Sequence, residues 1–227
     1  MRKIGIILLI CVFAISCKNQ EKEIKKQELT NKAKTELISE FKEMEKLDQL
    51  NRSFLQVGTL NQNLIDSVSS LSIQKYIAFL SSFESELSKK QQDSLWSIQN
   101  EIDLKNTNKL YSIIKKYGWL STTRLDSIVS PMIFLFHTPP ETIAKMQDIL
   151  LQEVKENRME PINYATYVDN MRKKAFGKNQ LYGTGDEFDP ETKSIVPPFI
   201  ENIDSTNMER VKIGLPELKE GDFRSDK

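Results

Sequence analysis

Cysteine is nearly absent from this sequence of 227 residues, and this absence excludes several kinds of protein. The two cysteines, Cys11 and Cys17, both lie among the first 17 residues. The remaining chain therefore has no thiol for a disulfide framework, for a cysteine-ligated zinc site or for thiol catalysis.

Histidine is represented by His137 alone. The spacings that announce a dedicated metal site, such as His-x-x-x-His or an EF-hand loop, do not occur, so we expect neither a metal nor a cofactor. A Gly-x-Ser-x-Gly nucleophile elbow and a phosphate-binding loop are also missing.

The chain has no excess of positive charge, with 32 basic and 32 acidic residues. Removing a leader that contains Arg2 and Lys3 would leave 30 basic residues against 32 acidic ones. Because a nucleic-acid backbone attracts proteins with a basic surface, we expect no nucleic-acid partner.

The first residues have the pattern of a secretory leader. Arg2 and Lys3 precede an apolar run over residues 4–15, which is too short to remain as a membrane span. The run ends in Ala14-Ile15-Ser16-Cys17, which resembles a bacterial lipobox, with residues 1–16 removed and Cys17 lipidated. The alternative is a plain signal peptide with an incidental cysteine. We expect a bacterial envelope protein anchored to a membrane, the outer one in preference, by a palmitate-bearing lipid, with its domain facing the periplasm or the cell surface.

Residues 17–27 are polar and predict a flexible tether, followed by a single helical domain over residues 28–218 and a frayed tail over 219–227. Apolar residues recur at three- and four-residue steps over most of this domain. The pattern predicts a mostly α fold of about six or seven helices, including separate helices before and after Asp103. Thr206 and Glu209 have the spacing of a capping box and predict the start of the last helix.

The stretch over residues 177–199 breaks the helical pattern with three glycines and three prolines. It predicts a β-hairpin at about 180–199, with strands over 180–188 and 194–199. Such a hairpin is marginal alone, so we expect it to lie on the helices.

His137 is one candidate for a functional side chain. It follows the apolar run Met132-Ile-Phe-Leu-Phe136 and precedes Thr138-Pro139, which suits a general base or a ligand at the mouth of a pocket. It also suits a structural histidine at a helix C-terminus, bonded to a free carbonyl.

The second group of candidates lies near the hairpin. Asp169 and Arg172 are one helical turn apart, which suits either a polar pair aimed at the hairpin or a surface ion pair. The glycines at the start of the hairpin permit close approach of a ligand, or shape only the entry to the strand. We expect ligand-binding residues at Arg172, Gln180, Tyr182, Gly183, Thr184 and Arg210, and catalytic candidates at His137, Asp169 and Tyr182.

An ordered series of short motifs resembles the bacterial family known as domain of unknown function 6624. The series comprises Asp48-Gln49 with Arg52, Asp103 with Asn106, Gly118-Trp119, His137, Asp169 with Arg172, Gln180-Leu-Tyr-Gly-Thr184, and Arg210 with Gly214-Leu-Pro216. The resemblance covers roughly residues 36–218. It implies an architecture and a place to look, since the family has no established activity.

Three functional hypotheses follow. The first is a non-enzymatic envelope lipoprotein that binds a protein partner or a small ligand through a polar pocket near the hairpin. The second is a hydrolase of envelope material, in which His137 acts as the base and Asp169 orients it. The third is a toxin or immunity protein.

Overall fold

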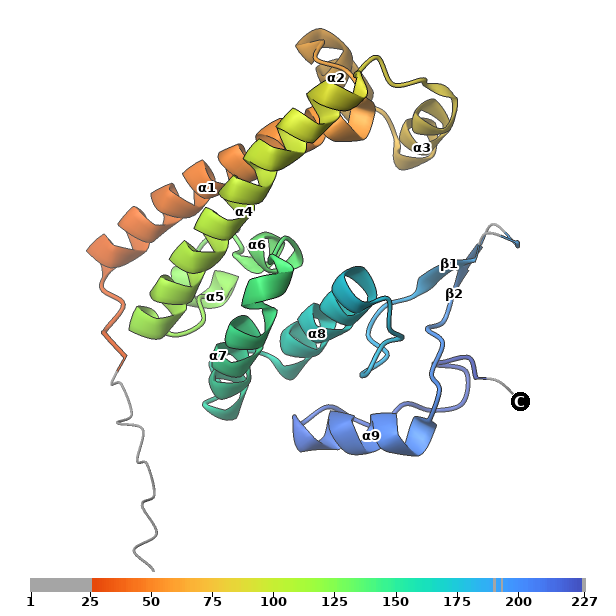
Figure 1. Cartoon of the computed structure of the whole chain (residues 1–227). Coiled ribbons are helices and arrows are strands. Elements are labelled where there is room, and N and C mark those ends of the chain that lie inside the picture. The colour runs from red at the N-terminus through yellow and green to blue at the C-terminus, as the bar shows by residue number, and fades with distance from the viewer. Residues whose placement is uncertain (1–25, 190, 193, 226–227) are drawn as a thin grey trace, which may run out of the picture.

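The computed structural model describes residues 26–189, 191–192 and 194–225 (Figure 1). This part of the chain contains nine α-helices and one two-stranded antiparallel hairpin near the C-terminus, which confirms the predicted mostly α fold. Within it, no helix combines the length and the apolar character needed to cross a membrane. The predicted leader and Cys17 lie outside the described residues.

Two long helices form one side of the molecule, α1 over Asn31–Val57 and α4 over Lys89–Tyr117 (Figure 1). They run antiparallel and lie against each other. Their apolar contact faces include Leu37 and Phe41 of α1 and Leu110 and Ile114 of α4, all buried.

The prediction that Asp103 starts a separate helix is wrong. Asp103 lies inside α4, and the capping box at the start of this helix is made by Ser88 and Gln91. No glycine or proline interrupts α4. The carboxylate of Asp103 therefore bonds across to α1 and does not cap its own helix.

The connection between the two long helices folds into α2, Gln62–Ser69, and α3, Ile73–Ser82. Gly58 ends α1 in the left-handed conformation, which is common for glycine at the end of a helix. No residue of α3 is buried.

The short helix α6, Met132–Phe136, is inserted among the longer helices. Phe134 and Leu135 are almost fully buried, so this apolar run is part of the core. The helix is only five residues long and is capped at its C-terminus by His137. The surrounding elements are α5 (Thr122–Leu125), η1 (Pro140–Thr142), α7 (Ile143–Lys155) and α8 (Pro161–Phe176).

The hairpin is shorter than predicted, with β1 over Glu187–Asp189 and β2 over Ser194–Val196. Pro197 and Pro198 lack the N–H that would extend the ladder. Residues 180–185 form a turn held by side chains in place of a strand.

The last helix, α9, spans Ile203–Lys212 and is capped by Asn202. The predicted start at Thr206 is therefore wrong, because the Asn202 side chain accepts the bond from the Ser205 amide, one turn earlier. Beyond it, within the predicted frayed tail, Arg224 bonds through its backbone to Pro198 and Ile200.

Candidate functional site

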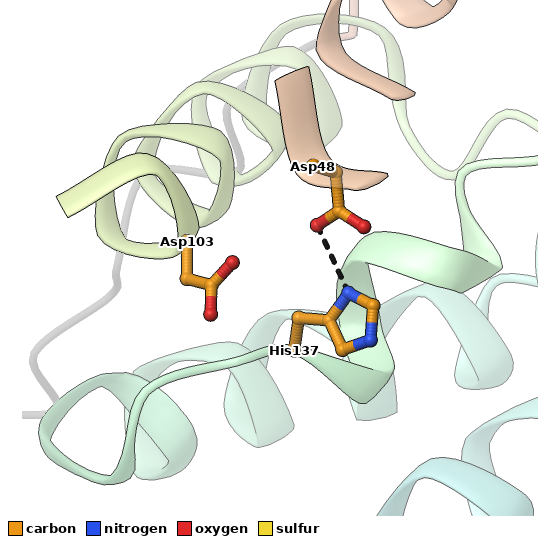
Figure 2. Close-up of side chains that lie close together, drawn as sticks. All are labelled: Asp48, Asp103 and His137. Atoms are coloured by element: carbon orange, nitrogen blue, oxygen red, sulfur yellow. Dashed lines mark hydrogen bonds and ion pairs between the residues drawn. The ribbon is translucent and has the colours of Figure 1, made fainter. Parts of the chain in front are cut away.

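A group of buried and partly buried polar residues includes His137, and we call it the His137 cluster. It consists of His137 at the end of α6, Asp48 and Arg52 on α1, and Gln99 and Asp103 on α4. The two aspartates extend from neighbouring helices towards the imidazole (Figure 2). Asp48 and Gln99 have no exposed surface, and the side chain of His137 is 18% exposed.

The cluster exists because polar residues occupy core positions of both long helices. On α1 the buried positions Phe41 and Met44 are followed by Asp48 and then Asn51, at the spacing of the same face. On α4 the buried face likewise begins with polar residues before it becomes apolar at Leu110. Burying a charge is costly unless it is paired, so each of these groups requires a partner.

Asp48 supplies the partner of His137. Its Oδ1 atom lies 2.9 Å from Nδ1 of the imidazole. Its Oδ2 atom accepts a hydrogen bond from Gln49 at 2.5 Å and lies 3.7 Å from Nε of Arg52. An ionised carboxylate only accepts hydrogen bonds, so Nδ1 of His137 is the protonated nitrogen of the neutral ring.

Arg52 connects the two carboxylates. Its Nη2 atom donates to both oxygens of Asp103, at 2.6 and 2.5 Å. Gln99 adds a further bond to Asp103 at 2.9 Å, whereas its own buried carbonyl oxygen has no partner among the described residues. This arrangement joins α1 to α4 and leaves each carboxylate next to a positive charge.

Lys174 of α8 approaches the same region. Its Nζ atom donates to the carbonyl oxygen of Phe136, the residue before His137, at 2.9 Å. Desolvation of the ammonium lowers the pKa of Lys174, and repulsion by Arg52 lowers it further. The carboxylates of Asp103 and Asp48 oppose this shift, so the four charged groups share one electrostatic environment.

Three of these residues could offer ligands to a metal ion. Asp48, Asp103 and His137 each have a ligand atom within 4.8 Å of the others, a convergence that the spacing of the residues in the sequence does not reveal. However, both oxygens of Asp103 already accept bonds from Arg52. A divalent cation would have to compete with this guanidinium, which already offsets part of the charge of the two carboxylates.

A second group of polar residues fastens the hairpin, and we call residues 180–185 the hairpin neck. Asp169 of α8 is buried and accepts four hydrogen bonds from the neck. The donors are the amides of Leu181, Tyr182 and Thr184 and the Thr184 hydroxyl, at 2.7 to 3.0 Å. Burial raises the pKa of Asp169, and these four bonds only partly offset the effect.

The other predicted neck residues also bond inward. Gln180 accepts from the amides of Thr184 and Gly185 and donates to the Gly185 carbonyl. Arg210 donates to the carbonyl oxygens of Tyr182 and Pro216, at 2.5 and 2.6 Å. Burial raises the pKa of Tyr182 and lowers that of Arg210. These contacts give the neck a role in folding, since its polar groups are used within the chain.

The structure thus divides the predicted site residues into two groups. His137 belongs to the His137 cluster, and its partner is Asp48, not Asp169. The hydrogen bonds that the described residues make to Asp169 come from the neck. Arg172 is on the surface of α8 and donates to the carbonyl of Asn179. The neck itself contains Gln180, Tyr182, Gly183 and Thr184, and Arg210 of α9 donates to it.

Two residues at the His137 cluster, Gln99 and Lys174, are not predicted from the sequence. The sequence offers one signal for Gln99, since it lies one helical turn before Asp103 on the face of α4 that later carries Leu110. Lys174 lies 37 residues after His137 in the sequence, and only the packing of α8 brings it close.

A third buried group holds the start of the described chain. Glu153 of α7 is fully buried and accepts bonds from Arg158 at 2.5 and 2.9 Å and from the Trp119 amide at 2.8 Å. Lys26 lies 3.0 Å from the same carboxylate and also donates to the Ile114 carbonyl. This group fixes the beginning of the domain to its core and is separate from His137 in its contacts.

Comparisons with protein-family models, with curated proteins and with solved structures found no match to this chain. The resemblance to domain of unknown function 6624 therefore stays a prediction.

Proposed function

We propose that this chain is a lipid-anchored protein of the bacterial envelope with an acid–base site of the hydrolase type, in which His137 transfers the proton. The observation that carries the proposal is the pairing of Nδ1 of His137 with the buried carboxylate of Asp48 at 2.9 Å. Asp48 thus takes the orienting role that the sequence analysis assigned to Asp169.

This pairing gives the imidazole a defined chemical state. Because Asp48 accepts from Nδ1, the lone pair of the neutral ring is on Nε2. No described residue forms a hydrogen bond with Nε2, and the side chain is partly exposed. The Nε2 atom can therefore accept a proton from a water molecule as the water oxygen attacks a substrate, and later return it to the leaving group.

Asp48 acts as a positioning residue in this proposal. It holds the ring and stabilises the imidazolium that forms when Nε2 takes the proton. Arg52 and Asp103 keep the carboxylate in place, since the guanidinium lies between the two acids. The lipid anchor at Cys17 would restrict the substrates to envelope material.

The test uses the purified full-length protein and compares it with His137→Gln and Asp48→Asn. Diethyl pyrocarbonate should modify His137 in the folded protein, as followed by the absorbance of the modified ring. Hydrolysis of p-nitrophenyl acetate and of p-nitrophenyl phosphate should identify the type of ester attacked.

We expect at least one of the two esters to be hydrolysed, and this activity to fall at least about 100-fold in His137→Gln, a typical contribution of acid–base catalysis. Circular dichroism melting of each variant separates this loss from unfolding. An unreactive His137 in the folded protein, or equal hydrolysis by wild type and His137→Gln, would overturn the proposal.

A second candidate function is the binding of a protein partner, and one observation favours it. Phe188 and Ile195 are paired across the hairpin and are 63% and 67% exposed. Side chains of directly paired residues lie on the same face, so the hairpin presents an apolar pair to solvent.

Site-specific photocrosslinking tests this second function. A photocrosslinking residue at position 195 should capture an envelope protein, whereas one at position 155 should not. The absence of a specific adduct at 195 counts against partner binding.

A further inference from the structure

The nitrogen donors of the His137 cluster are not all used within the protein. The Nη2 atom of Arg52 donates to Asp103, whereas its Nη1 atom forms no hydrogen bond with the described residues. The Arg52 side chain is 15% exposed. The Nε2 atom of His137, which carries the lone pair of the neutral ring, also forms no hydrogen bond in this part of the chain. The cluster therefore has a guanidinium donor that remains available to a ligand, next to an imidazole nitrogen that can take up a proton.

Lys174 adds a further donor next to the His137 cluster. An ammonium group has three N–H donors, and the contact with the carbonyl of Phe136, the residue before His137, uses one of them. Lys174 is an exposed residue of α8, and its other two donors form no hydrogen bond with the described residues. The charges of Arg52, Asp103 and Asp48 all act on its amino group, so this cation lies within the electrostatic environment of the cluster.

The negative groups of the cluster are directed inward. Asp48 has no exposed surface, and only 10% of the Asp103 side chain is exposed. All four carboxylate oxygens lie close to a donor of Arg52, Gln49, Gln99 or His137. The accessible groups are thus two cations and an imidazole, and their complement is an anion and not a metal ion.

We propose that the substrate of the His137 site carries a compact oxyanion, a phosphate or carboxylate group, that docks on Arg52 and Lys174 beside Nε2 of His137. Guanidinium and ammonium groups both form strong charge-assisted hydrogen bonds with such oxygens. The docked anion places the neighbouring part of the substrate next to the imidazole. This inference rests on the proposed acid–base function and specifies what the site recognises.

The test follows the ring signals of the single histidine by NMR while sodium phosphate or sodium acetate is added at fixed pH and constant ionic strength. We expect a saturable shift of the His137 signals with at least one of the two anions. Sodium chloride at the same ionic strength should produce no saturable shift.

The neighbouring lysines of α8 provide a matched pair of variants. Lys174→Gln should weaken binding of the anion at least about tenfold, the loss expected for one charge-assisted contact, whereas Lys174→Arg should retain most of it. Lys173→Gln should bind as wild type does, because Lys173 pairs with Glu187 at the hairpin. The same weakening in both Gln variants would indicate a general charge effect and overturn the inference.

The outcome can be separated from that of the proposed function. If His137 is reactive and hydrolyses an ester, but neither anion gives a saturable shift, the acid–base site stands and the anion-docking inference fails. If the anions bind but His137→Gln leaves hydrolysis unchanged, the cluster is a binding site and the proposed catalysis fails.

Discussion

Asp169 offers the most quantitative prediction, because its carboxylate organises the hairpin neck. Replacing it with alanine removes the acceptor of four hydrogen bonds. The Thr184 amide retains Gln180 as an acceptor at 2.9 Å, and its hydroxyl can rotate towards another partner. The amides of Leu181 and Tyr182 lose their acceptor.

The expected loss of folding stability follows from these two amides. A buried donor without a partner costs about 1–3 kcal/mol, and the Tyr182 amide is buried whereas the Leu181 amide is partly buried, so Asp169→Ala should destabilise the fold by about 3 kcal/mol. In a domain of this size, that corresponds to a melting temperature lower by roughly 6–12 °C. Asp169→Asn should cost much less, because its carbonyl oxygen still accepts from both amides and the burial of a charge is relieved.

The assay is thermal unfolding by circular dichroism, combined with amide hydrogen exchange at residues 181 and 182. Asp189→Ala is the control, since Asp189 also accepts bonds from Glu191 and Thr192 but at an exposed turn, where water can replace it. We expect the control to melt as wild type does. A normal melting temperature for Asp169→Ala with protected amides at 181 and 182 would refute this account of the neck.

Two further predictions concern stability. Burial disfavours the charge of Glu153, but the hydrogen bonds from Arg158 and its other donors outweigh burial and lower the pKa of Glu153. The ionised carboxylate therefore stabilises the fold at a pH above its pKa in the unfolded chain. This stabilisation is lost as the pH falls through its pKa in the folded protein. In urea unfolding, Glu153→Gln should therefore be less stable than wild type at pH 7, with a smaller difference at about pH 3; a pH-independent difference would contradict this. Gly183→Ala should lower the melting temperature more than Gly177→Ala does. Both glycines have positive φ, so both substitutions strain the backbone. However, an added Cβ at 183 would lie 2.9 Å from the Leu218 side chain, whereas nothing lies within 4 Å of one at 177. Equal melting temperatures for the two variants would show that the contact at 183 is unimportant.

The helical fold was predictable because its signals are local. Apolar residues at helical spacing predict α1, and the break in the helical pattern at Gly177 coincides with the end of α8. The sequence predicts two helices in place of α4, because an aspartate such as Asp103 is typical of a helix cap. In the structure the Asp103 carboxylate bonds to Arg52 of α1 and does not cap a helix.

The partners within the sites were not predictable from local pattern. Asp48 and His137 are 89 residues apart, and the register of α1 against α6 brings them together. The sequence suggests only as one hypothesis that Asp169 orients His137. In the structure the amides of Leu181, Tyr182 and Thr184 donate to the Asp169 carboxylate, so Asp169 holds the neck.

The central claim, that Asp48 orients His137 for acid–base chemistry, is tested most directly by the nitrogen-15 chemical shifts of this single imidazole. Long-range proton–nitrogen spectra of the neutral ring should show a protonated Nδ1 and an unprotonated Nε2, and Asp48→Asn should weaken this preference. A neutral ring protonated on Nε2 in the wild-type protein would contradict the claim, because Nδ1 would then not donate to Asp48.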